Sequence, residues 1–427
     1  MHVKRRNFLQ GVAASAALSV FNSAQAEAVI ASADARADNE DFWRSIRAQY
    51  DLPDDIIQLE NGNWGVMSRP VMKEYFAQTQ KVNTLSSYYS RRQFLPEFFT
   101  IVKQTAALLG AGDNEIAFTR GATEALMNLI SNYRGLKTGD AVMYADTDYD
   151  SAQAAFDKWQ QRGMKRIVIN LPEQATDEEY VAFYRTALEQ NPQVKLLLLT
   201  HMSHRHGLVI PVKEVVAEAR KLGVDCIVDA AHSWGQLDFT VEDLGADFIA
   251  FNLHKWMGAP LGAGIMYIRN GRLNDIAQAA GDGSEDTSRI YTRVHSGTLN
   301  MASWLTVPAA LEFHSKMGGG KGSALKATRL AYLRRYWWQQ LADIKGVELI
   351  AADNDHAMGA ISSLRLKGQT SAEANKAIAA RLLKEFNIFS VHRTGLAGGA
   401  CVRITPSVFN TTTELDQLAS ALKTMAL

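Results

Sequence analysis

The amino-acid sequence predicts an α/β protein in which a mostly parallel, helix-covered sheet forms a large domain and a smaller α+β domain follows it. Between about residues 140 and 269, short apolar runs of strand length alternate with amphipathic stretches of helical length. Such alternation is typical of a parallel sheet covered by helices. After Thr298 the pattern changes to long helical stretches followed by weaker strands, which indicates the second domain.

The large domain is predicted from six apolar segments that we interpret as buried strands. They are Ala141–Tyr144, Arg166–Asn170, Lys195–Thr200, Val224–Val228, Phe248–Phe251 and Gly264–Ile268. Two of the intervening helices have recognisable starts. Thr176–Gln190 opens with the capping-box sequence T-D-E-E, and Pro211–Leu222 begins with proline, which suits the first turn of a helix.

The small domain is predicted to begin with two long helices, Met301–Met317 and Ala327–Ile344. The glycine run between them is interpreted as a flexible connector, because Lys321 is followed by Gly322 rather than Ser or Thr and no strand precedes it. The remaining predicted elements are the strands Val347–Ile350, Ala360–Leu366 and Val402–Thr405 and the helices Thr370–Phe386 and Thr411–Met425.

Composition excludes several classes of protein. The chain has 427 residues with 45 Lys+Arg and 45 Asp+Glu, so bulk charge does not predict binding to nucleic acid or to an anionic membrane. A hydrophobic content of 47% excludes disorder as the main state. Cys226 and Cys401 are the only cysteines, too few for a disulfide framework or a four-cysteine zinc site. We predict no metal centre.

The first 26 residues have the layout of an export signal. Lys4, Arg5 and Arg6 precede a mildly apolar run from Gly11 to Phe21, and the small-residue site Ala24-Gln25-Ala26 follows it. The apolar run is shorter than the ~20 residues of a membrane span. Residues 1–26 are therefore predicted to be a twin-arginine signal peptide, which implies the Tat machinery as a partner and the periplasm as the location. Residues 27–58 are predicted to be an N-terminal tether or arm.

Candidate chemistry gathers at predicted strand ends. Asp229 closes one apolar strand and Lys255 follows the next, and ligands of open parallel sheets bind at this edge. Alone, the two residues fit a buried ion pair equally well. The segment Thr119–Leu126 reads as a glycine turn and a helix start, which is a ready anion site. Tyr149 adds a ring at the same edge. An anion site, a carboxylate, a flat ring and a lysine together describe a site for pyridoxal 5′-phosphate (PLP).

The sequence resembles the fold-type I PLP-dependent enzymes of the class V aminotransferase family, in particular the isopenicillin N epimerase-like branch. The resemblance runs from about Leu59 to the C-terminus and implies a large PLP-binding domain at 59–310 and a small C-terminal domain at 311–427. Its motifs are N-G-N-W-G at 61–65, Thr119–Leu126, Asp148-Tyr149, His201–Gly207, Asp229–Gly235, His254-Lys255-Trp256, Gly297-Thr298 and Val402-Arg403-Ile404.

The resemblance also implies roles for individual residues. Lys255 would bond the cofactor's aldehyde and move protons at the substrate, and Asp229 would face the pyridine nitrogen. Tyr149 would stack on the ring and His232 would bind its phenolic oxygen. Trp64 and His204 would lie near the substrate, and Arg403 would bind its carboxylate. The expected phosphate contacts are Ala122, Thr123, Asn252, His254 and, from the partner of a homodimer, Thr298.

The leading predicted function is amino transfer on an amino acid or on an amino-acid residue of a larger metabolite. Epimerisation, or decarboxylating or lyase-type chemistry during tailoring of the siderophore pyoverdine, is the alternative. That pathway is implied by a resemblance of the whole sequence, export signal included, to periplasmic pyoverdine-tailoring enzymes. A non-catalytic PLP-binding sensor is the alternative outside enzymes. Because residues 391–400 contain no cysteine, a cysteine desulfurase is not expected.

Overall fold

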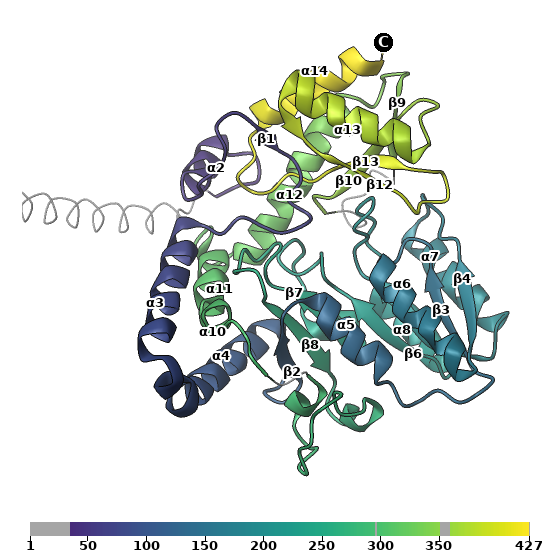
Figure 1. Cartoon of the computed structure of the whole chain (residues 1–427). Helices are drawn as coiled ribbons and strands as arrows, with labels where there is room; N and C mark the ends of the chain where they lie inside the picture. The colour runs from purple at the N-terminus through teal and green to yellow at the C-terminus, as the bar shows by residue number, and fades with distance from the viewer. Residues whose placement is uncertain (1–34, 295–296, 351–358, 427) are drawn as a thin grey trace, which may run out of the picture.

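The computed structural model describes residues 35–294, 297–350 and 359–426, and Figure 1 shows their arrangement. The predicted signal peptide and the first eight residues of the predicted arm lie outside the described residues. The α/β architecture is confirmed: a seven-stranded sheet forms the centre of the large domain and a four-stranded sheet that of the small domain. No helix in the described part of the chain is long and apolar enough to cross a membrane.

The seven-stranded sheet has the order β2-β8-β7-β6-β5-β3-β4. The five strands from β7 to β4 run parallel, whereas β8 is antiparallel to both of its neighbours. The strands are β2 (Ile116–Thr119), β3 (Ala141–Ala145), β4 (Lys165–Ile169), β5 (Val194–Thr200), β6 (Asp225–Asp229), β7 (Phe248–Asn252) and β8 (Gly264–Ile268). All six predicted strands are present, but the prediction that β4 is buried is wrong. It lies at the sheet edge, where Lys165 and Arg166 are exposed.

Helices cover both faces of this sheet, which explains why its inner strands are apolar on both sides. On β5, Leu196 and Leu198 pack with residues of α5 and α6, whereas Leu197 and Leu199 pack with residues of α7 and α8. The elements around the sheet are α3 (Arg69–Arg92), α4 (Phe94–Leu109), α5 (Ala122–Ser131), α6 (Asp150–Asp157), η1 (Lys158–Arg162), α7 (Asp177–Glu189), α8 (Val212–Lys221), α9 (Val241–Leu244), η2 (Leu273–Asp275) and η3 (Ile290–Arg293). The predicted capping box of α7 is confirmed, with Thr176 and Glu179 each accepting the other's backbone N–H.

The small domain has a sheet in the order β12-β13-β10-β9. Its elements are β9 (Val347–Ile350), β10 (Ser362–Leu366), α13 (Ala372–Phe386), β11 (Ile388–Phe389), β12 (Val391–Arg393), β13 (Cys401–Ile404) and α14 (Thr412–Ala426). The N-terminal segment joins this domain: after α2 (Glu40–Arg47), β1 (Ile57–Gln58) pairs in parallel with β11. Residues before and after the large domain are thereby brought side by side.

The connection between the two domains differs from the prediction in detail. The predicted helix Met301–Met317 is two helices, α10 (Met301–Leu305) and α11 (Val307–Lys316). Pro308 explains the break, because proline has no N–H and its ring clashes with the carbonyl of the preceding turn. The helix predicted at Ala327 begins earlier, as α12 (Gly322–Gln339).

The change from one hydrophobic core to the other occurs within α12. Leu330 belongs to the core of the large domain and Leu333 to that of the small domain. The predicted boundary at 310/311 falls inside α11, which packs with the large domain.

Candidate active site

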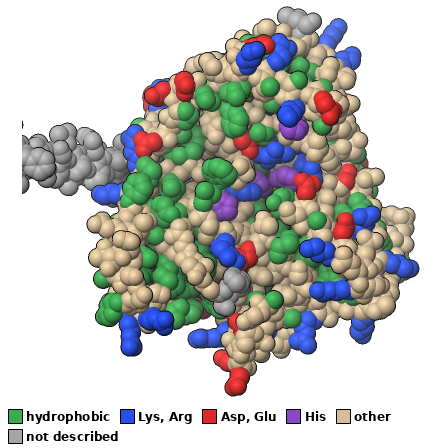
Figure 2. All heavy atoms as spheres, in the orientation of Figure 1, with side chains coloured by type: hydrophobic (Ala, Val, Ile, Leu, Met, Phe, Trp, Pro, Cys, Tyr) green, Lys and Arg blue, Asp and Glu red, His purple; other side chains and the backbone are tan. Residues whose placement is uncertain are grey.

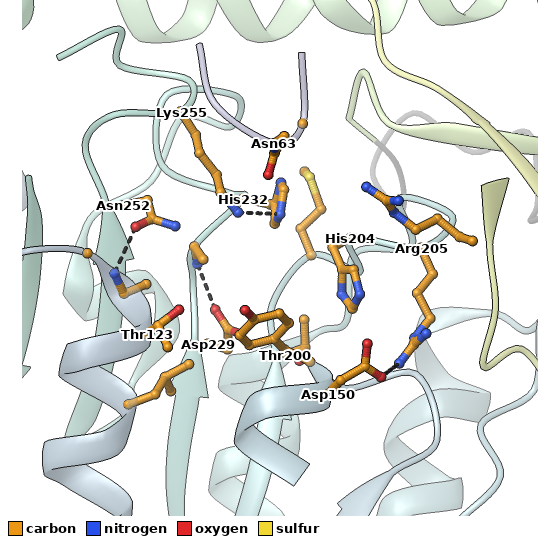
Figure 3. A pocket seen from close by; sticks show the side chains of 18 of the residues that line it. Asn63, Thr123, Asp150, Thr200, His204, Arg205, Asp229, His232, Asn252 and Lys255 are labelled. Carbon is orange, nitrogen blue, oxygen red and sulfur yellow. Dashed lines mark hydrogen bonds and ion pairs between the residues drawn. The ribbon is translucent and has the colours of Figure 1, made fainter. Parts of the chain in front are cut away.

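A cavity of about 620 Å³ lies between the two domains, at the carboxyl ends of the parallel strands. Asp229 and Asn252 are the last residues of β6 and β7, and Thr200 is the last residue of β5. The small domain closes the other side with His392, Arg393, Thr394 and Arg403. Figure 2 shows the positively charged and histidine side chains gathered at the hollow in the middle of this face, and Figure 3 shows the lining from close by.

Lys255 projects into the cavity and contacts His232. The two nitrogens, Nζ of Lys255 and Nε2 of His232, lie 2.7 Å apart (Figure 3). The indole N–H of Trp256 points at Nδ1 of His232 from 3.4 Å. A neutral imidazole that accepts at Nδ1 has its proton on Nε2, so in this tautomer His232 donates to Lys255 when the amine is in its uncharged form. Burial lowers the pKa of Lys255 to about 8 and that of His232 well below its usual value. Lys255 is therefore placed and tuned as a nucleophile.

Asp229 supplies a buried carboxylate to the same cavity. One oxygen accepts the backbone N–H of Ala231 at 2.9 Å, and no partner for the other is found in the described part of the chain. Burial raises the pKa of Asp229, opposed by the Ala231 hydrogen bond and the charge of Lys255. The free oxygen can therefore accept from a cationic N–H group, and charge-assisted hydrogen bonds of this kind are about twice as strong as neutral ones.

The N-terminus of α5 forms one end of the cavity. Ala122, Thr123, Asn252 and His254 all line it. The Asn252 side chain accepts the N–H of Ala122 at 2.7 Å (Figure 3), which fixes the helix start against β7. The N–H groups of the first helical turn have no acceptor within the helix, so this end suits an anion. The site depends on close packing, because a side chain at Gly264 would lie 2.5 Å from the Cα of Gly121.

Tyr149 and His204 lie together on another wall of the cavity. Their ring centroids are 5.7 Å apart in an edge-to-face arrangement, and His204 stacks on His232 at 6.3 Å. Burial and the nearby cations Arg205 and Arg403 lower the pKa of His204 well below its usual value. His204 is thus a neutral imidazole at neutral pH.

Arg403 lies buried on β13, facing the cavity from the small domain. It donates to the carbonyl of His204 at 2.6 Å and forms an ion pair with the buried carboxylate of Glu60. The second oxygen of Glu60 has no partner among the described residues, and Arg393 reaches the paired oxygen from 3.5 Å. Two guanidinium groups thus share one carboxylate, and the surplus positive charge suits the carboxylate of a substrate.

Two predicted residues do not line this cavity. Trp64 is 54% exposed and lines a neighbouring cavity, next to Asn63, which does point into the site (Figure 3). Thr298 is exposed on this single chain and lies outside the cavity lining. Its expected role is with a partner subunit. The other predicted residues, Lys255, Asp229, His232, Ala122, Thr123, Tyr149, Asn252, His254, His204 and Arg403, are brought together.

Several lining or supporting residues were missed by sequence reasoning, among them Asn63, Glu60, Arg205 and Arg393. Arg205 is buried and ties the loop after β5 to Asp150 at the start of α6 and to the carbonyl of Thr394 in the small domain. For Arg205 a signal was present, because it stands inside the quoted motif at 201–207. Glu60 and Arg393 gave no local signal, since their roles depend on contact between distant segments.

Comparisons with known proteins agree with this geometry. Residues 69–418 match the family model for aminotransferase class V. The isopenicillin N epimerase of Amycolatopsis lactamdurans is 25% identical over 90% of this chain and 98% of its own. A cysteine desulfurase from Thermococcus onnurineus has a similar fold, with a TM-score of 0.75, 20% identity, and coverage of 91% of this chain and 98% of its own.

A second structure, a C-DES variant with glycine covalently linked to its PLP cofactor, has a TM-score of 0.77 at 19% identity, covering 88% of this chain and 98% of its own. The chain belongs to the class V aminotransferase family of PLP-dependent enzymes and has fold type I. PLP is its cofactor, and the donor set fits it: an anion site for the phosphate, the free oxygen of Asp229 for the pyridine nitrogen, and the Lys255 amine for the aldehyde.

Proposed function

We propose that this enzyme transfers the amino group of an amino acid, free or as a residue of a larger metabolite. The observation that supports this most directly is the amine of Lys255, which contacts His232 and whose pKa is lowered by burial to about 8, in a cavity whose far side carries the buried guanidinium of Arg403. When bound, PLP supplies an electron sink for the electrons left by a broken bond at the substrate α-carbon.

In this proposal the residues of the chain act in sequence. Arg403 binds the substrate carboxylate, and the α-amino group is directed toward the site of the aldehyde. Once freed, the Lys255 amine removes the proton from the α-carbon. Its pKa of about 8 is close enough to neutrality for this proton transfer. Asp229 keeps a proton on the pyridine nitrogen by its charge. His232 orients Lys255 throughout.

The reaction is tested by incubating the holoenzyme with candidate amines and keto acids. Transamination predicts release of the keto acid and, on addition of a second keto acid, formation of the corresponding amino acid and return of the cofactor's original absorbance. Release of carbon dioxide would instead establish decarboxylation. The absorbance of the bound cofactor could also stay unchanged with every amine, including any metabolite that differs between wild-type and deletion strains. That result would favour a PLP-binding sensor.

Epimerisation is the second candidate, favoured by the position of His204. This neutral imidazole packs against the edge of Tyr149, the ring expected to cover one face of the cofactor. Inversion at the α-carbon requires a proton acceptor on one face and a donor on the other. Lys255 is one such group, and His204 offers the second. In deuterated water, epimerisation predicts loss of optical purity with deuterium at the α-carbon and no keto acid.

We further propose that the enzyme works in the periplasm, where it tailors a siderophore such as pyoverdine. The twin-arginine motif of residues 1–26 supports export, and an open cavity suits a residue of a larger molecule. Replacement of Arg5 and Arg6 by lysine should leave the enzyme in the cytoplasm. Mass spectrometry of siderophores from wild-type and deletion strains identifies the metabolite whose side chain changes.

A homodimer is also proposed. Large hydrophobic side chains are exposed on the side of the molecule formed by α3 and α4, among them Phe76, Tyr88, Leu95 and Leu108, and Figure 2 shows hydrophobic atoms gathered there. Exposed apolar patches of this kind mark interfaces. Sedimentation should give twice the mass of the chain. The double variant Phe76→Asp, Tyr88→Asp should sediment with the mass of a single chain.

A further inference from the structure

Lys326 is a buried lysine behind the active site. It lies on α12, the helix that joins the two hydrophobic cores, and borders a cavity of about 20 Å³ that is also lined by Lys255 and Trp256. This volume is enough for about one water molecule. The lining includes Tyr50, His314 and the two lysines but neither Asp nor Glu. Lys326 is therefore a buried cation without an acidic partner in its cavity.

The ammonium group of Lys326 donates to the backbone carbonyl of Trp256. That carbonyl belongs to the residue directly after Lys255. The preceding two carbonyls are also held: His254 accepts from the N–H of Gly65 at 2.9 Å and Lys255 from that of Gly258 at 3.2 Å. Among these contacts, only that of Lys326 comes from a charged side chain, and charge-assisted hydrogen bonds are about twice as strong as neutral ones.

The groups that face Lys326 do not offset its charge. His314, one helix away on α11, is buried, and its Nε2 is engaged by Ser323 while its Nδ1 has no partner among the described residues. Tyr50 is partly buried, and burial of its hydroxyl raises its pKa further above neutrality. Arg329, one turn along α12, is paired with Glu40 of the N-terminal helix. Burial alone lowers the pKa of Lys326 to about 7.

We propose that Lys326 is a positioning residue whose ammonium group fixes the turn that carries Lys255, and that deprotonation of Lys326 weakens this hold. The inference rests on the assignment of Lys255 as the cofactor lysine. Because α12 also joins the two domains, Lys326 ties the turn that carries Lys255 to the helix that leads into the small domain. Lys326 touches neither substrate nor cofactor, so it acts through the backbone of Trp256.

The test compares the rates at which wild type and Lys326→Gln lose their cofactor after dilution, followed by the absorbance of the bound cofactor without substrate. Glutamine is a neutral donor at every pH. We expect the variant to lose its cofactor about tenfold faster than wild type at pH 6, where Lys326 is charged. At pH 9, where wild type is also neutral, the two rates should be nearly equal.

A merely structural role would give the same ratio at both pH values, and equal rates at pH 6 would also overturn the proposal. Lys326→Met, which removes the donor altogether, should lose the cofactor faster than wild type at both pH values. If that variant does not fold, the glutamine variant decides the question. Lys221→Met, a change at an exposed lysine on α8, is the control and should match wild type. Borohydride reduction and peptide mapping of the wild type test Lys255 itself, so failure of that assignment is recognised separately.

Discussion

Nζ of Lys255 lies 2.7 Å from Nε2 of His232, and the Trp256 indole N–H, 3.4 Å from Nδ1, favours the tautomer that can donate to the uncharged form of the lysine. Removal of this donor should misplace the amine. His232→Leu is expected to lower kcat about tenfold, in line with one lost hydrogen bond, whereas His232→Gln should retain most of it. Steady-state kinetics of both variants check this, and equal losses would contradict the hydrogen-bond role.

The charge of Asp229 should matter more than its shape. Asp229→Asn keeps the size and the hydrogen bond from Ala231 but removes the charge that would keep the pyridine nitrogen protonated. Holding that proton without a counter-charge costs about 3–5 kcal/mol, so the turnover rate should fall by roughly two to four orders of magnitude. The absorbance of the cofactor should shift as well. Asp238→Asn, outside the cavity, is the matched control.

Arg403 should contribute mainly to substrate binding. Arg403→Lys replaces a two-pronged donor with a point charge, and KM for a substrate with a carboxylate should rise at least about tenfold with little change in kcat. An amine that lacks the carboxylate should be unaffected. If both amines lose affinity equally, Arg403 holds the fold of the site rather than the carboxylate.

The rate at which PLP bonds to the apoenzyme should depend on pH through Lys255. Burial lowers the pKa of this amine from 10.5 to about 8, and only the unprotonated form attacks the aldehyde. Between pH 6 and 8 the rate should therefore rise about tenfold per pH unit and level off above about 8. Stopped-flow absorbance measures this. A rise that continues to pH 10 would show that Lys255 has an ordinary pKa.

Gly207 should resist substitution. Its φ is +84°, and a Cβ there would lie 1.8 Å from the carbonyl oxygen of Ile361 in the small domain. Gly207→Ala is expected to lower the free energy of unfolding by more than about 1 kcal/mol, measured by urea denaturation. Gly139→Ala has a similar φ of +97° but open space around it. Both variants carry the backbone strain of a positive φ, so the difference between their free energies of unfolding gives the effect of the clash with Ile361.

The part of the site that lies at the ends of the strands could be predicted from the sequence. Asp229 and Lys255 follow apolar runs closely, so the edge of a parallel sheet brings them together without knowledge of any other contact. The burial of β4 was predicted wrongly, because an apolar run does not reveal which strand ends at an edge. Pro308 lies in the first turn of α11, within an otherwise helical pattern, so α10 and α11 were predicted as one helix.

The contribution of the small domain could not be predicted from local pattern. Arg393 meets Glu60 across 333 positions of sequence, and the pairing of β1 with β11 that brings them together joins two strands of only two residues each. Trp64 stands in a motif that supports the site, yet successive side chains in an extended segment point in opposite directions. Asn63 faces the cavity and its neighbour does not.

Lys255 belongs to the large domain and Arg403 to the small one, with the cavity between them. An amino acid that reaches both through its amine and its carboxylate is therefore a cross-link between the two halves of the molecule. Its binding energy adds to the stability of their contact. A substrate should raise the thermal stability of both halves together, whereas an amine without a carboxylate should protect only the half that holds the cofactor.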